Sequence, residues 1–134
     1  MSKPLPIFAF FLILSVLYGT GFSQKASVIP AVPGAEVFPL SQLKEGMKGT
    51  ARTVFRGTEP EEFGVEILGV VPGSIGPHQD LIIGKLSGEN AMRTFVFAGM
   101  SGSPVYIDGK IVGAISYSFP FAKEPICGIT PIEQ

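Results

Sequence analysis

The sequence predicts an all-β fold, a barrel or a sandwich, made of many short strands. Glycine and proline are frequent, at 17 and 12 of 134 residues, which suits tight turns better than long helices. Short apolar and β-rich runs recur along the chain, and glycine-containing turn clusters separate nearly all of them. No stretch shows a sustained 3.6-residue period with helix caps, so only a single helical turn is expected, at residues 41–44.

The expected strands follow from local pattern. In the stretch 63–71, alternation places Phe63, Val65, Ile67, Gly69 and Val71 on one face. The strands are expected at residues 49–56, 63–71, 80–86, 93–98, 105–107, 111–117 and 126–132.

One hairpin is marked by its turn residues. Asp108-Gly109 separates two β-rich runs, and this dipeptide favours a type I′ turn because both central residues need positive φ. The run 126–132 looks like a further strand after which no closing element follows. We therefore expect an open strand edge there, and a domain that is incomplete at its C-terminus.

The first 23 residues have the pattern of a signal peptide. Lys3 supplies the positive charge, residues 7–17 form an apolar run, and Gly21 and Ser23 are the small residues before a cut at Gln24. The run is too short for a spanning helix, although an uncleaved anchor is the alternative. The sequence thus predicts an exported chain, periplasmic or extracellular and free of the membrane after cleavage. Its parts are a signal helix at 1–23, a linker at 24–35 and a β domain at 36–134.

Composition excludes some classes of function. The net charge is −1, and no basic stripe with interleaved aromatic residues is present, so nucleic-acid binding is not expected. The single cysteine, Cys127, permits no internal disulfide and no multi-cysteine zinc site, and we expect it to be a buried apolar residue. No metal and no cofactor is predicted.

Ser101 is the candidate nucleophile. Gly99 and Gly102 bracket it, so the backbone there has conformations that other residues avoid. Such a loop can turn the N–H groups of Gly99 and Ser101 into one concavity, where they would bind a developing oxyanion. Pro104 then leads into the next strand. A plain turn of glycine, serine and proline is the alternative interpretation.

The residues around Ser101 also carry a resemblance. Gly99-Met-Ser-Gly-Ser-Pro104 resembles the Gly-x-Ser-Gly-Gly-Pro loop of chymotrypsin-like peptidases. The longer stretch GMSGSPVYIDGKIVGAISYSFPFAKEPICGITPIE is similar to the active-site segment of the SpoIVB serine peptidase family, known from the stage IV sporulation protein B. The similarity extends back through LKEGMKGTARTVFRGTEPEEFGVEILGVV. It implies a chymotrypsin-like β-barrel, one barrel or an incomplete one. It also implies serine endopeptidase activity on a protein or peptide, with Ser101 as nucleophile and the amides of Gly99 and Ser101 as the oxyanion hole.

A general base is harder to find. His78, the single histidine, lies in a Gly-Pro-His-Gln-Asp turn, and it is a weak candidate for the base, with Asp80 or Glu66 as its orienting carboxylate. In the two-barrel fold, base and nucleophile come from different barrels, so a larger separation is expected. Family members carry the histidine in a Gly-His segment that is not found here.

Three functions therefore stay open. The first is the nucleophile-bearing part of an exported serine endopeptidase, inactive by itself for lack of a histidine base. The second is a non-catalytic module that binds extended peptides by strand addition. The third is an independent small enzyme that uses His78.

Overall fold

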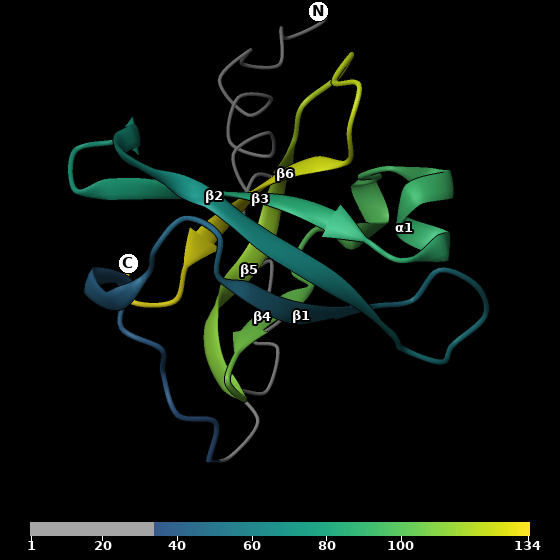
Figure 1. Ribbon diagram of the computed structural model, residues 1–134, viewed down its shortest axis with the longest axis horizontal. Coiled ribbons are helices and arrows are strands. Elements are labelled where there is room, and N and C mark those ends of the chain that lie inside the picture. The colour runs from purple at the N-terminus through teal and green to yellow at the C-terminus, as the bar shows by residue number, and fades with distance from the viewer. Residues whose placement is uncertain (1–33) are drawn as a thin grey trace, which may run out of the picture. The chain divides into compact units, whose positions relative to one another are not determined.

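Six antiparallel strands close into a barrel in the order β1-β2-β3-β6-β5-β4 (Figure 1). The computed structural model describes residues 34–134, so the predicted signal peptide and most of the predicted linker lie outside the described residues. The strands are β1 (Lys48–Thr53), β2 (Glu61–Gly76), β3 (Gln79–Ser87), β4 (Pro104–Ile107), β5 (Lys110–Ser118) and β6 (Ile126–Pro131). The helical parts are α1 (Glu89–Thr94) and 3₁₀ turns at Leu40–Gln42 and Ala98–Met100. The predicted all-β barrel is confirmed.

Alternating side chains of β2 and its neighbours fill the barrel. Phe63, Val65 and Ile67 are buried, as the alternation predicts. The register with β3 shifts between Ile67 and Gly69, where a bulge moves the chain by one position. The expectation that Val71 continues the buried face is therefore wrong, and its side chain is 44% exposed. In the sequence, a glycine is the only sign of this bulge, and the alternation of apolar and polar residues does not show where it lies.

The turn between β4 and β5 has the predicted geometry. Asp108 and Gly109 have φ of 50° and 76°, as a type I′ turn requires. The strands on either side pair from Ile107↔Lys110 to Pro104↔Ala114.

The strand predicted at 93–98 is not present. The structure has α1 (Glu89–Thr94) there, followed by a loop and the 3₁₀ turn Ala98–Met100. Val96 and Phe97 pack against the core from this loop. The apolar run at 93–98 therefore indicates burial and not strand pairing. α1 has an acidic residue in its first turn and a basic residue in its last, which agrees with the helix dipole.

The open edge expected at residues 126–132 is also wrong. β6 pairs with β3 on one side and with β5 on the other, so it lies inside the sheet. β4 and β1 then pair through Thr50↔Tyr106 and Ala51↔Val105, which closes the barrel. The expectation failed because it took the last strand in the sequence to be the last strand in space.

The core consists of apolar side chains from all six strands and from Met100, which precedes the candidate nucleophile. Cys127 is fully buried in it, as predicted, and burial raises the pKa of its thiol to about 12. No helix within residues 34–134 has both the length and the apolar character needed to cross a membrane.

Candidate active site

Ser101 lies between the 3₁₀ turn Ala98–Met100 and β4. The side chains alternate in and out: Met100 is fully buried, Ser101 is exposed, and Ser103 is buried again. Met100 thus anchors the loop in the core, and Ser101 remains at the surface, where a nucleophile has to be.

Backbone hydrogen bonds tie this loop to β5. Gly102 donates to the carbonyl of Ile115 at 2.7 Å, and Ile115 donates to the carbonyl of Ser103 at 2.9 Å. Gly102 has φ of 87°, a conformation that favours glycine. The loop is therefore held by a strand of the barrel immediately beyond Ser101, and its position depends on a glycine that the sequence singles out.

The two predicted oxyanion donors lie in the turn before Ser101. The Ser101 N–H donates to the carbonyl of Ala98 at 3.2 Å, within the 3₁₀ turn and not within a strand ladder. Gly99 is exposed, and a Cβ at this position would lie 2.7 Å from Cε2 of Phe97. Ser101 can give its amide to an oxyanion only if the Ala98 carbonyl turns away first.

A small cavity of about 50 Å³ adjoins Ser101. Its walls are largely apolar, and one side of it is the end of β5. The residues that line it are Val96, Phe97, Ala98, Ser101, Ile115, Ser116, Tyr117 and Ser118.

The end of β5 offers a free strand edge beside this cavity. The pairing of β5 with β4 ends at Pro104↔Ala114, whereas its pairing with β6 continues to Ser118↔Cys127. In the described part of the chain, Tyr117 and Ser118 therefore have a strand partner on one side only, and Ser116 lies at a register shift in the pairing with β6. Their other side faces the cavity with Ser101, so an extended peptide could pair there.

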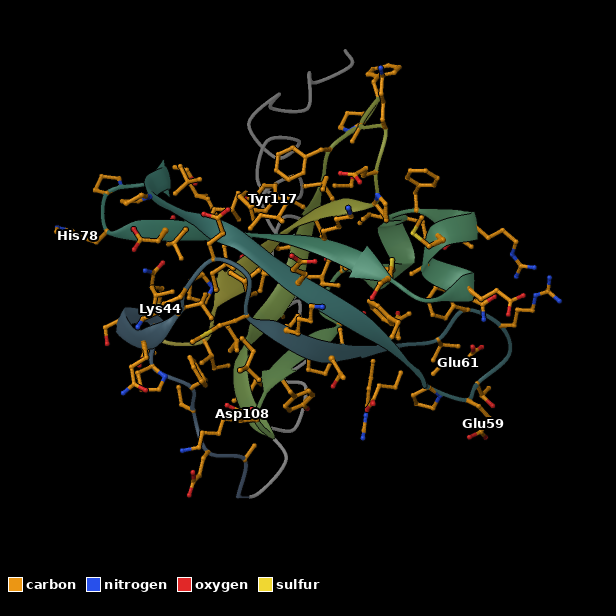
Figure 2. The ribbon with its side chains drawn as sticks, in the orientation of Figure 1. Lys44, Glu59, Glu61, His78, Asp108 and Tyr117 are labelled. Atoms are coloured by element: carbon orange, nitrogen blue, oxygen red, sulfur yellow. The ribbon has the colours of Figure 1, made fainter. Side chains whose placement is uncertain are left out.

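His78 lies at the turn between β2 and β3, where Gly76 pairs with Gln79. It is exposed, with φ of 60°, and it follows Pro77, as expected of the third residue of a type II turn. Figure 2 shows it at the tip of the hairpin, pointing away from the barrel, while Tyr117 lies over the barrel. It is not among the residues that line the cavity beside Ser101.

The two carboxylates proposed to orient His78 have other partners. Asp80 Oδ1 accepts a hydrogen bond from the N–H of Gly73 at 2.9 Å, which braces the same hairpin. Glu66 lies opposite Lys85 in the β2–β3 register and contributes to the rise in the pKa of that lysine. The structure thus brings Ser101 and Gly99 together and places His78, Asp80 and Glu66 elsewhere.

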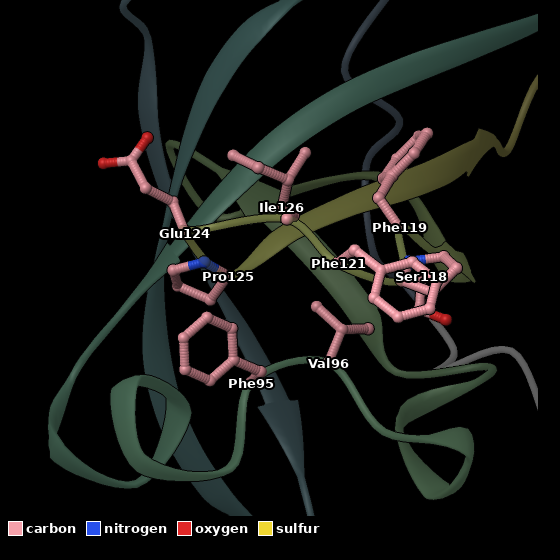
Figure 3. Close-up of a pocket in the computed structure, with 10 residues that line it drawn as sticks. Phe95, Val96, Ser118, Phe119, Phe121, Glu124, Pro125 and Ile126 are labelled. Carbon is pink, nitrogen blue, oxygen red and sulfur yellow. The ribbon is translucent and has the colours of Figure 1, made fainter.

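A larger pocket of about 410 Å³ adjoins the cavity, and none of the sequence predictions pointed to it (Figure 3). It lies between the loop after α1 and the β5–β6 loop, and it shares Val96 and Ser118 with the cavity beside Ser101. The run Ser118-Phe-Pro-Phe121, two aromatic residues around a proline after a strand, is the signal that could have pointed to it.

Comparison with known families identifies a match that covers most of the chain. The family model described as SpoIVB peptidase S55 matches residues 17–130, which include the serine loop and both walls of its cavity. No curated protein and no solved structure shows significant similarity to the chain.

Proposed function

The chain belongs to the SpoIVB peptidase S55 family, and we propose that it is the nucleophile-bearing part of an exported serine endopeptidase. In this proposal the Ser101 hydroxyl attacks a peptide carbonyl and gives its proton to a general base. The amine of the cleaved bond leaves with a proton, and water then hydrolyses the acyl ester on Ser101.

One observation carries the proposal. An exposed serine lies on a loop that the barrel holds in place, next to a free edge of β5 at residues 117–118. A peptide that pairs with this edge as an additional strand would run past Ser101 in extended form. Strand addition binds main chain through hydrogen bonds and leaves the side chains to adjoining pockets.

The general base is proposed to come from a Gly-His segment that the resemblance implies and residues 1–134 do not include. His78 lies at the tip of a hairpin and outside the cavity with Ser101. The chain by itself is then expected to react slowly, because the serine hydroxyl remains protonated.

Labelling with a fluorophosphonate tests this mechanism. The full chain should label slowly, and added imidazole, which can supply the missing base from solution, should increase the rate. Ser101→Ala should abolish labelling, while Ser74→Ala, at an exposed serine of β2, should leave it unchanged. His78→Ala should also have no effect.

Two results would replace the proposal. Loss of labelling in His78→Ala would support the independent enzyme that uses this histidine. A chain that binds peptides but shows no labelling, with or without imidazole, would support the non-catalytic module. That module is the second candidate because the β5 edge suffices for it, and it predicts that Ser101→Ala binds peptides normally.

Export is proposed from the apolar run at 7–17 and the small residues before Gln24. Sequencing the N-terminus of the protein recovered outside the cytoplasm should give Gln24. An intact N-terminus on a membrane-bound protein would support the uncleaved anchor instead.

A further inference from the structure

The larger pocket is lined mostly by apolar residues, and it shares two lining residues with the cavity beside Ser101. Figure 3 shows Phe95 opposite Pro125, with Phe121 beside Val96. Val96 and Ser118 line both spaces, so the two are neighbours and a peptide on the β5 edge would pass both. The remaining walls are Phe119, Pro120, Ala122, Glu124 and Ile126.

Backbone strain is concentrated at this pocket. Within residues 34–134, four residues other than glycine have positive φ: His78, Phe95, Asp108 and Phe121. His78 and Asp108 are in two-residue hairpin turns, where positive φ is ordinary for such residues. Phe95 and Phe121 have φ of 55° and 68°, and for them positive φ is unusual because bulky side chains strongly disfavour this region. Both line the pocket.

Both positions are ones that glycine usually fills. Phe95 is the C-cap of α1, and its N–H donates to the carbonyl of Ala91; its φ of 55° and ψ of −158° lie in a region that is almost exclusive to glycine. Phe121 is the third residue of a turn in which Pro120 is second and Ala122 donates to Phe119 at 3.3 Å; this position also favours glycine.

The strain at Phe121 is not offset by packing. Its side chain is 101% exposed, so folding buries none of it, and the Phe95 side chain is 39% exposed. An aromatic residue that is strained and contributes nothing to the core suggests a role in binding, because strain of this kind persists mainly at functional sites.

The charge on the pocket wall favours an apolar ligand. Glu124 is the acidic residue of the lining, and its carboxylate is paired with Lys85, whose pKa this contact raises. The wall therefore offers aromatic and proline surface rather than a free charge.

We propose that Phe95 and Phe121 select the substrate by binding an aromatic or branched aliphatic side chain of the peptide held at Ser101. The inference rests on the proposed function, since it takes the bound peptide to lie along the β5 edge. The aromatic side chains then gain contact area only when the peptide is bound.

Tripeptide boronic acids test the selection, because boron bonds reversibly to a serine hydroxyl at the position of the scissile carbonyl. The probes are an all-alanine tripeptide boronic acid and three others in which phenylalanine replaces one residue in turn, each titrated against the full chain. One phenylalanine probe should bind about tenfold more tightly than the all-alanine probe, because burying its ring in the pocket removes apolar surface from water. Equal binding of all four probes would overturn the inference.

Variants of Phe121 separate binding from folding. Phe121→Gly should remove the advantage of the phenylalanine probe, while the midpoint of thermal unfolding stays the same or rises, because the strain is relieved and no buried contact is lost. Phe121→Tyr should keep the advantage. Asp108→Gly is the matched control at another positive-φ position, away from the pocket, and should leave all four affinities unchanged. A fall in thermal stability of Phe121→Gly would show that the side chain serves the fold, against the proposal.

The two proposals fail in different ways. If Ser101→Ala binds every boronic acid as the wild type does, the serine is not the nucleophile and the proposed function fails. If Ser101→Ala weakens all the probes while Phe121→Gly changes none, the nucleophile stands and only the selection by this pocket fails.

Discussion

The carbonyl oxygen of Ala98 holds the amide that Ser101 would need for an oxyanion. The hydrogen bond between them, at 3.2 Å, belongs to a single 3₁₀ turn. Rotating the peptide between Ala98 and Gly99 would break it and leave the Ser101 N–H free. Gly99 is the residue best able to accept such a rotation, because it has no side chain to restrict φ and ψ.

Gly99→Ala should therefore slow labelling of Ser101. A Cβ at this position would lie 2.7 Å from Cε2 of Phe97, and an alanine would also restrict the rotation of the preceding peptide. We expect the imidazole-assisted labelling rate to fall about tenfold or more, as for the loss of an oxyanion donor. Circular dichroism should show an intact barrel. A labelling rate equal to that of the wild type would contradict the role assigned to this glycine.

At the level of single residues, the sequence predicted features that steric restriction of the backbone determines. It did not predict features that depend on the rotation of a single peptide bond plane. The glycines around Ser101 predicted an exposed hydroxyl on a tight loop, and the structure has Ser101 exposed there. They did not predict that the Ser101 amide donates to Ala98, because both states of this peptide are open to a glycine. Phe95 and Phe121 were missed because nothing in a sequence shows that a phenylalanine has positive φ.

At the level of elements, the β5–β6 pair leaves no room for a side chain at Gly113. A Cβ there would lie 2.1 Å from the carbonyl oxygen of Thr130, a backbone atom that cannot move without displacing β6. Gly113→Ala should lower the free energy of unfolding in urea by about 1–3 kcal/mol, as overpacking does.

Gly76→Ala is the matched control for this change. Its added Cβ would meet only the Oε1 of Gln79, at 3.1 Å, at the end of a flexible side chain. Its stability should stay within about 0.5 kcal/mol of the wild type. Equal losses in the two variants would mean that the close approach of β5 and β6 does not limit the barrel.

The sequence predicted most strands because alternation and turn residues are local signals. The strands at 48–53, 104–107 and 110–118 lie close to their predicted positions, and the Asp108-Gly109 turn has its expected form. The errors arose where tertiary contacts decide. Val96 and Phe97 are apolar because they cover the core from a loop, and Val71 is displaced by a bulge.

At the level of the whole molecule, the buried thiol of Cys127 makes stability depend on alkaline pH. Its pKa is raised from 9.0 to about 12 by burial, so the unfolded chain loses this proton at a lower pH than the folded chain does. The contribution is fully present below pH 9 and is lost as the pH rises from about 9 to about 12.

The free energy of unfolding should thus fall across this range by an amount of the order of a few kcal/mol. Urea titrations at several pH values measure it. Cys127→Ala leaves every other side chain in place, so a shallower slope in this variant isolates the thiol. Identical slopes would show that Cys127 titrates in the folded chain as it does in the unfolded chain.

The class of architecture could be predicted from sequence, but the order of strands could not. Many short strands indicated a barrel or a sandwich, and the closed barrel is one of these two. The position of β6 between β3 and β5 depends on contacts between residues far apart in the chain, such as Gly84↔Cys127. Local patterns do not encode such pairings, and so the expected open edge was wrong.

The pairing of β1 with β4 has consequences for how the barrel folds and how it opens locally in the native state. It joins distant parts of the chain through two residue pairs, Thr50↔Tyr106 and Ala51↔Val105, whereas β1 and β2 pair over six. Joining remote segments costs loop-closure entropy before stabilising contacts form. The β1–β4 pairing, which we call the seam, should therefore form last during folding and open first in the native protein. Amides of β4 should then exchange with solvent deuterium sooner than those of β3. Weakening the seam should hasten unfolding and leave the refolding rate nearly unchanged.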